Sequence, residues 1–112
     1  MRVGCIGAVT VDTIVRHGAS LKAPGGTSFF AALALAALKN SVTIVTAYGY
    51  DWKPYEEELS SYGISTVNLK PSSTSTAFKI TYGERGRTLI LLRPSEEIKP
   101  DESLLKEFDA IV

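Results

Sequence analysis

PGGTSFFAALALAAL, residues 24–38, joins a glycine pair to a run of alanine and leucine. Both residue types have high helix propensity, so the run predicts a helix over residues 29–38. Thr27 or Ser28 can cap the first-turn amides of this helix. Because the run has almost no polar face, we expect the helix to be buried on most sides, with its alanines close against a sheet.

Two apolar, β-branched segments flank this helix, at residues 2–9 and 42–47. Each is typical of a buried strand. A strand, a helix and a second strand in this order form a crossover that favours a parallel sheet. The predicted fold class is therefore α/β, with a parallel, Rossmann-like core. Two shorter strands, over residues 11–16 and 19–23, come between the first strand and the helix.

The middle of the chain predicts a second helix and a further strand. The helix covers residues 54–62, with Asp51 as a candidate cap, and Gly63 ends it. Residues 64–69 form the strand. A Pro/Ser/Thr-rich loop over residues 71–76 follows.

The last third predicts a hairpin, a helix and a final strand. Strands over residues 76–82 and 87–92 flank Gly83-Glu84-Arg85-Gly86, which is a strong antiparallel hairpin signal. A helix over residues 101–108 precedes an apolar strand at 109–112. A parallel sheet continued by later residues would explain this last strand, so we expect residues 1–112 to be one portion of a larger domain.

The composition fits a soluble globular domain of 112 residues, 45% of them hydrophobic and 21% charged. Twelve Lys and Arg balance twelve Asp and Glu, so the net charge of zero implies neither a nucleic-acid nor a membrane partner. No apolar run approaches the roughly 20 residues of a membrane span. Cys5 and His17 are the only cysteine and histidine, which excludes an intramolecular disulfide and a Cys/His metal cluster. We expect a cytoplasmic protein.

The familiar phosphate-binding motifs are missing from the sequence. A dinucleotide-binding turn needs G-x-G-x-x-G, and only Gly4 and Gly7 occur at the first strand. The P-loop string G-x-x-x-x-G-K-[ST] does not occur either. The glycine pair Gly25-Gly26 is the sharper feature, because it lets the backbone approach a ligand beside the free amides of a helix start. The alternative is a tight strand-to-helix turn with no ligand.

Several motifs of the sequence, in their order and spacing, resemble those in the N-terminal half of the ribokinase-like, PfkB-type carbohydrate kinases. The matching segments are Ile6-Gly7-Ala8-Val9-Thr10-Val11-Asp12, Gly25-Gly26-Thr27-Ser28-Phe29-Phe30-Ala31-Ala32, Leu38 and Tyr48-Gly49-Tyr50-Asp51. The resemblance covers nearly all 112 residues. It implies a ribokinase-type core with a small antiparallel β lid, formed by strands at about 11–23 and 76–93.

The resemblance also implies a substrate site. Asp12 would accept hydrogen bonds from sugar hydroxyls, Gly25 and Gly26 would present backbone amides, and Thr27 would lie beside the substrate. The alternative for Asp12 is an ordinary turn carboxylate. Phe30 stands where many members carry a sugar-binding asparagine, so it either stacks on a sugar or nucleoside ring or belongs to the core. Asp51 matches a G-x-D position, where a helix cap explains it equally well.

Basic residues outnumber acidic ones in the hairpin, with Lys79, Arg85, Arg87 and Arg93 against Glu84. As part of a lid they would help to bind a phosphorylated substrate. The alternative is that they are solvated and prevent edge-to-edge pairing. Lid strands of the family often pair between subunits, which would place in a homodimer face the apolar residues Phe78, Ile80, Tyr82, Leu89 and Leu91.

The function implied is that of the substrate-binding segment of a sugar kinase. The parent enzyme would transfer the γ-phosphoryl of ATP, with Mg²⁺, to a hydroxyl of a carbohydrate or nucleoside. The family's catalytic residues lie around a G-A-G-D motif in the C-terminal, nucleotide-binding half, and no such string occurs here. The chain alone is therefore expected to be inactive, to bind no ATP or Mg²⁺ and to contain no catalytic residue. The alternative is a non-catalytic sugar-binding or dimerisation module.

Overall fold

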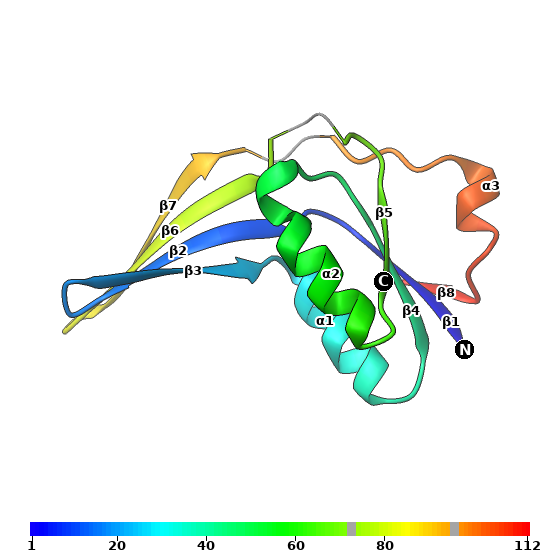
Figure 1. The fold of residues 1–112 in the computed structure, drawn as a ribbon, viewed down its shortest axis with the longest axis horizontal. Helices are drawn as coiled ribbons and strands as arrows, with labels where there is room; N and C mark the ends of the chain where they lie inside the picture. Colours follow the sequence, from blue (N-terminus) through cyan, green and yellow to red (C-terminus); the bar gives the residue numbers. More distant parts are fainter. Residues whose placement is uncertain (72–73, 95–96) are drawn as a thin grey trace.

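The computed structural model describes residues 1–71, 74–94 and 97–112. It contains two four-stranded sheets and a small set of helices (Figure 1). In chain order the elements are β1 (Arg2–Ile6), β2 (Thr10–Arg16), β3 (Ala19–Gly25), α1 (Thr27–Ala37), β4 (Ser41–Thr46), the 3₁₀ helix η1 (Tyr50–Trp52), α2 (Lys53–Ser61), β5 (Ser65–Asn68), β6 (Thr76–Gly83), β7 (Gly86–Arg93), α3 (Glu102–Leu105) and β8 (Ala110–Ile111).

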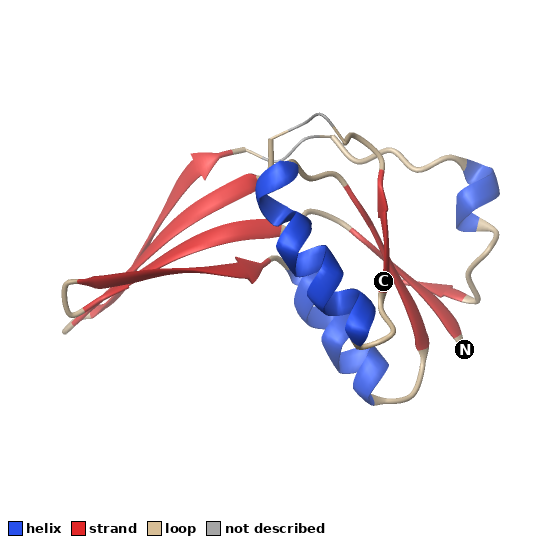
Figure 2. Ribbon diagram, in the orientation of Figure 1, coloured by secondary structure: helices blue, strands red, loops and turns tan. Residues whose placement is uncertain are grey.

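The core sheet has the strand order β5-β4-β1-β8, and all its neighbouring strands are parallel. This confirms the parallel sheet predicted from the apolar segments around the first helix. Helix α1 packs on β1 and β4, and α2 packs on β5. The two helices lie next to each other and share a small cavity, while α3 lies at the far end of the molecule (Figure 2).

The outer sheet has the strand order β3-β2-β6-β7 and extends away from the core sheet on the side opposite α3 (Figure 1). The predicted hairpin of β6 and β7 is present and antiparallel, and the two shorter strands predicted before the first helix, β2 and β3, also pair antiparallel. Between them, however, β2 and β6 are parallel, so the sheet is mixed rather than wholly antiparallel. The reason is topological: β2 follows the carboxyl end of β1 and β6 follows that of β5, so both strands leave the core in the same direction.

Helix α1 departs from its prediction at both its start and its surface. Thr27 already belongs to the helix, and Gly26 occupies the cap position with no side-chain capping bond, so the predicted caps were wrong. The expected burial on most sides was also wrong. Ser28, Phe29 and Ala32 are buried, whereas Phe30 and Leu33 in the helix and Leu38 directly after it are exposed. The core sheet covers only one face of this helix.

Helix α2 lies within one residue of its predicted range at both ends, but its predicted cap is wrong. Gly63 has a φ of 78°, and its amide donates to the Ser60 carbonyl, which is a glycine-terminated helix end. Asp51 does not cap the helix, because Trp52 occupies the cap position without a side-chain bond. The Asp51 carboxylate instead accepts a hydrogen bond from Arg93 at 2.8 Å. A distant ion pair has replaced the local cap.

The two ends of the described chain meet in the core sheet. β8 lies beside β1 in parallel register, which confirms the predicted terminal strand. The preceding helix is shorter than the predicted 101–108, and Asp101 caps it by accepting from the Leu104 amide at 2.9 Å. Phe108 lies over β1, where a Cβ on Gly4 would come within 2.6 Å of its ring. The first strand stops at Ile6, short of the predicted 2–9.

The hydrophobic core lies between the core sheet and helices α1 and α2. Its buried residues are Val3, Cys5, Val9, Val11, Phe29, Ala32, Val42, Ile44, Tyr48, Trp52, Leu59 and Ile64. Trp52 is completely buried among the rings of Phe29, Tyr48 and Tyr55. Its indole N–H donates to the Thr10 carbonyl at 2.9 Å, so Trp52 also fixes the first residue of the outer sheet. Across the described ranges, no helix is long and apolar enough to cross a membrane.

Candidate functional site

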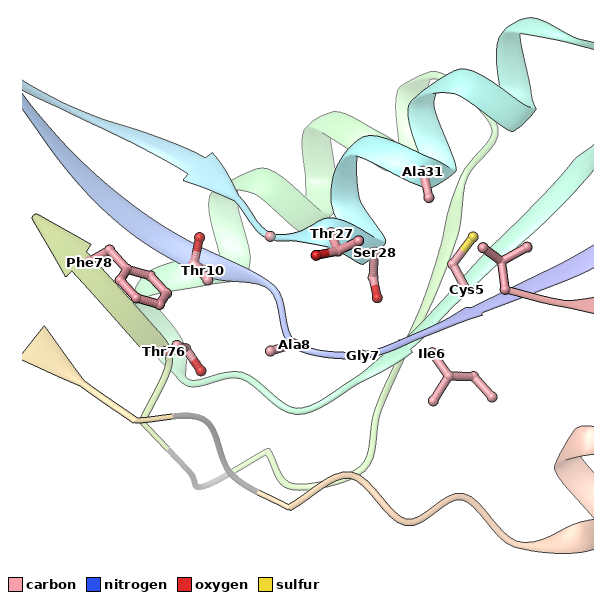
Figure 3. A pocket seen from close by; sticks show the side chains of 12 residues that line it. Cys5, Ile6, Gly7, Ala8, Thr10, Thr27, Ser28, Ala31, Thr76 and Phe78 are labelled. Carbon is pink, nitrogen blue, oxygen red and sulfur yellow. The ribbon is translucent and has the colours of Figure 1, made fainter. Parts of the chain in front are cut away.

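Two adjoining cavities lie where the core sheet meets the outer sheet. The inner cavity, of about 430 Å³, is lined by Cys5, Ile6, Gly7, Ala8, Thr10, Gly26, Thr27, Ser28, Ala31, Thr76, Phe78 and Val112. Figure 3 shows it between the start of α1 and the segment that leaves β1. The outer cavity, of about 720 Å³, is lined by Thr10, Asp12, Gly26, Thr27, Phe30, Ala31, Phe78, Ile80, Arg87 and Leu89. The shared residues make these cavities one continuous site.

Four of the five residues predicted for the substrate site line this outer cavity: Asp12, Gly26, Thr27 and Phe30. The fifth, Gly25, lies behind them at the end of β3, paired with Thr10. A Cβ on Gly25 would collide with the Asp12 carboxylate and the Thr10 hydroxyl. Gly25 therefore makes room for the carboxylate.

Asp12 projects from β2 in a half-buried position. Its Oδ1 accepts a hydrogen bond from the Thr10 hydroxyl at 2.8 Å. None of the ion pairs found among the described residues uses this carboxylate. A carboxylate has about four lone-pair sites, so Asp12 keeps acceptor capacity for hydroxyl donors in the cavity.

The start of α1 forms a second polar wall. Gly26 has a φ of 101°, and a Cβ there would lie 2.5 Å from the Ala8 carbonyl oxygen. Only glycine fits this close passage of two backbone segments. Because no side chain caps the helix, its first amides are open to a ligand that accepts hydrogen bonds. Thr27 and Ser28 lie at this end of the helix in Figure 3.

Phe30 is an exposed wall of the outer cavity. Its side chain is 60% exposed, and its ring packs edge-on against Phe29 with centroids 5.1 Å apart. The sequence left open whether Phe30 belongs to the core, and the structure excludes that alternative. An exposed aromatic face at a cavity suits the apolar face of a ring.

Comparison with solved structures identifies the architecture. A pyrophosphate-dependent kinase in the ribokinase family superimposes on 97% of the chain with a TM-score of 0.79 and 23% identity. The ribokinase from Cryptococcus neoformans var. grubii matches 80% of the chain with 0.69 and 26%. The fructokinase from Halothermothrix orenii matches 95% with 0.77 and 18%. The chain has the ribokinase-like fold.

This chain covers only part of those ribokinase-like proteins. It spans 39% of the pyrophosphate-dependent kinase, 33% of the Cryptococcus ribokinase and 43% of the fructokinase. No protein-family model matches the sequence, and no curated protein does. The ribokinase-like assignment therefore rests on the arrangement of the two sheets and on the motifs identified in the sequence.

Several lining residues of this site were assigned elsewhere or missed by sequence reasoning. Phe78, Ile80 and Leu89 were predicted to form a dimer face, and all three line the outer cavity. They share a face with Asp12 because Asp12 pairs with Phe78 and Ile80 with Leu89 in the outer sheet. The alternation of side chains along a strand predicts that these residues share one face of the sheet, but it does not predict that this face borders a cavity. Thr10 and Thr76 carried no distinguishing signal.

The four basic residues of the hairpin lie in different surroundings in the ribokinase-like fold. Arg87 lines the outer cavity, whereas Lys79 lies on the opposite face of the sheet by strand alternation. Arg93 donates to the Ser75 carbonyl at 3.1 Å and to Asp51, which ties the end of β7 to the core. Arg85 lies in the turn between β6 and β7. The charge excess is therefore not one continuous patch.

Cys5 lines the inner cavity but is a poor nucleophile, since burial raises the pKa of its thiol. Among the described residues, no group of three or more His, Cys, Asp and Glu side chains is placed to hold a metal ion. The lining of the site contains the Asp12 carboxylate, the Arg87 guanidinium, several hydroxyls and the rings of Phe30 and Phe78, beside the backbone amides at the start of α1.

Tyr48 gives the ribokinase-like core a predictable response to alkaline pH. Burial raises its pKa to about 12, to which the nearby Glu56 contributes, against the opposing hydrogen bond with Thr66. The unfolded chain ionises Tyr48 near pH 10, so this stabilisation is complete below pH 10 and is lost as pH rises toward about 12. We expect the free energy of unfolding, measured by urea denaturation, to fall more steeply over this range in the wild type than in Tyr48→Phe. Equal slopes would contradict the assignment.

Proposed function

We propose that this chain is the acceptor-binding part of a sugar kinase, which transfers a phosphoryl group to a hydroxyl of a carbohydrate or nucleoside. The observation that carries the proposal is the half-buried Asp12 carboxylate, which faces a cavity closed by the uncapped start of α1. Its neighbours Gly26, Thr27 and Phe30 provide amides, a hydroxyl and an aromatic face. This is the chemistry that a polyhydroxylated ring requires.

The solved structures with this fold support that class of reaction. One holds a pyrophosphate analogue and myo-inositol, and another is a fructokinase from Xylella fastidiosa with bound ATP. For this protein we propose ATP with Mg²⁺ as the donor, bound by residues outside this chain. Inorganic pyrophosphate is the competing donor, because the fold also occurs in pyrophosphate-dependent kinases. We propose a cytoplasmic location, in which the buried thiol of Cys5 remains reduced.

In the proposed mechanism, the described residues position the acceptor. The Asp12 carboxylate accepts hydrogen bonds from neighbouring hydroxyls and so fixes the rotation of the sugar ring. The amides at the start of α1 donate to ring or hydroxyl oxygens. Phe30 covers the apolar face of the ring and excludes water. Holding the acceptor in this way removes translational and rotational freedom before phosphoryl transfer.

The test is the binding of neutral polyols to the full-length protein, measured by isothermal titration calorimetry. Ribose, fructose and myo-inositol form the panel, and we expect at least one to bind. Asp12→Ala should weaken that binding by about 10–100-fold, because a hydrogen bond to a charged group contributes roughly 1.5–3 kcal/mol. Thr13→Ala, on the opposite face of β2, is the matched control and should leave the affinity unchanged. Binding that survives Asp12→Ala would contradict the proposal.

A dimerisation module is the second candidate, favoured by one specific observation. Strand β7 is at the edge of the outer sheet, and its apolar side chains Leu89, Ile90, Leu91 and Leu92 are all about half exposed. Analytical ultracentrifugation distinguishes the two functions. A module of this kind forms a dimer without sugar and dissociates in Ile90→Glu, whereas polyol binding is expected only of the acceptor site.

A further inference from the structure

We propose that the acceptor carries an anionic substituent, a phosphate ester or a carboxylate, which binds Arg87. This inference rests on the proposed function and specifies its substrate class. It follows from the position of one cation in the same cavity as Asp12. From the sequence alone, the basic residues of the hairpin could either bind a phosphorylated substrate as part of a lid or be solvated on an exposed surface.

Arg87 belongs to the face of the outer sheet that closes the cavity. It pairs with Tyr82 on β6, and Tyr82 pairs with Arg16 on β2. Asp12 lies four residues before Arg16 on the same strand, so strand alternation directs both toward one face. Arg87 and Asp12 both line the outer cavity, together with Phe30.

Among residues 1–71, 74–94 and 97–112, the two charges of this cavity form no ion pair with each other or with another side chain. The salt bridges of the described residues join Arg93 to Asp51 and Lys99 to Glu97, and neither involves Asp12 or Arg87. One cavity therefore offers a hydrogen-bond acceptor at one place and a guanidinium at another. The complementary ligand has hydroxyl donors at one end and an anion at the other, which a neutral sugar lacks.

The spacing suits such a ligand. The row that contains Arg87 is four residues along β2 from the row that contains Asp12, which corresponds to roughly 13 Å at 3.3 Å per residue. The long side chain of arginine reduces the distance that the ligand must span. An acceptor that extends beyond a single ring, such as a hexose with a terminal phosphate, fits this gap. Guanidinium binds phosphate and carboxylate through paired hydrogen bonds.

The other basic residues of the hairpin do not share this position. Lys79 lies on the opposite face, Arg93 is held by Asp51 and Ser75, and Arg85 lies in the turn. None of the three lines the outer cavity. Arg87 is thus the cation of the hairpin that a ligand beside Asp12 would meet, and Lys79 supplies a control of equal charge in the same sheet.

The experiment compares neutral and anionic acceptors in matched pairs. Isothermal titration calorimetry with the full-length protein uses ribose against ribose 5-phosphate, fructose against fructose 6-phosphate, and glucose against gluconate. At least one anionic acceptor should bind at least tenfold more tightly than its neutral partner, and the phosphate and carboxylate arms identify the anion. Arg87→Gln should abolish this preference by weakening the binding of the anionic acceptor more than that of its neutral partner. Arg87→Lys should retain part of it.

Lys79→Gln is the matched control and should keep the full preference. Equal affinities within every pair would overturn the inference while leaving the proposed function intact. So would a preference that persists in Arg87→Gln, or one lost equally in Lys79→Gln, which would indicate a general charge effect. An Arg87→Gln variant that weakens ATP or pyrophosphate instead of the acceptor would also overturn it. If no acceptor of either kind binds, the proposed function fails, and this inference fails with it.

Discussion

Replacement of Trp52 by alanine is expected to lower the free energy of unfolding by about 3–5 kcal/mol, the usual cost of truncating a large buried aromatic residue. Trp52 is completely buried and packs against three aromatic rings. Its removal leaves a cavity and also orphans the Thr10 carbonyl, to which the indole donates. Because Thr10 begins β2, the outer sheet loses a fixed point. Urea denaturation followed by circular dichroism measures the change.

Two variants separate the causes of this effect. Trp52→Phe keeps much of the aromatic packing but removes the hydrogen bond, so it should fall between wild type and Trp52→Ala. Tyr50→Ala removes a neighbouring aromatic side chain that is 89% exposed, and should change stability by less than about 0.5 kcal/mol. A Trp52→Ala cost as small as that of Tyr50→Ala would contradict the central place of Trp52 in the core.

Replacement of Gly26 by alanine is the second large effect, with an expected loss of about 2–4 kcal/mol. The backbone at Gly26, with φ 101° and ψ 149°, lies in a region that is open essentially to glycine alone and costs other residues about 1–3 kcal/mol. The added Cβ would also meet the Ala8 carbonyl oxygen at 2.5 Å and the Val9 Cα at 3.0 Å. Both contacts are with backbone, so no side chain can move away to relieve them.

The control for Gly26→Ala is Gly18→Ala in the β2–β3 turn. Gly18 also has a positive φ, 76°, but nothing lies within 4 Å of a Cβ placed there. We expect it to cost about 1 kcal/mol, from backbone conformation alone. Chemical denaturation of both variants gives the comparison. If both variants lost the same free energy of unfolding, the close approach of Gly26 to residues 8–9 would contribute nothing to stability, which would contradict this account.

The core sheet could be predicted because its signals are local. The apolar segments around the Ala- and Leu-rich run are each long enough to identify a strand, and the helix between them sets their parallel direction. The role of Asp51, before the start of α2, could not be predicted in this way. The partner of Asp51 is Arg93, 42 residues later, whereas the sequence offered a helix cap or a ligand contact as its role.

The parallel pairing of β2 with β6 was outside what local sequence shows. The hairpin of β6 and β7 was recognisable from its turn, but how it joins the pair of β2 and β3 depends on where each pair leaves the core. This pairing also decides the site, because it places Phe78 beside Asp12. Sequence reasoning therefore proposed Asp12 by resemblance and placed Phe78 in a possible dimer face, whereas the structure places both residues in the lining of one cavity.

The exposed face of α1 has a similar explanation. Composition predicted burial because alanine and leucine cover the whole helix, yet a helix on one sheet buries only the face that meets it. Phe30 lies on the uncovered side and so becomes available to the cavity. The number of layers around a helix is a property of the assembled fold, which composition does not contain.

The most direct test of the acceptor site is a titration of the ¹⁵N-labelled protein with the best-binding sugar or sugar phosphate, followed by amide chemical shifts. We expect the largest shifts at Asp12, Gly26, Thr27 and Phe30, whose side chains or backbone line the outer cavity. The separate cavity around Tyr48, Gly49 and Lys53 serves as the internal reference and should show little change. Shifts centred on that second cavity, with the amides at the start of α1 unmoved, would contradict the proposed acceptor site.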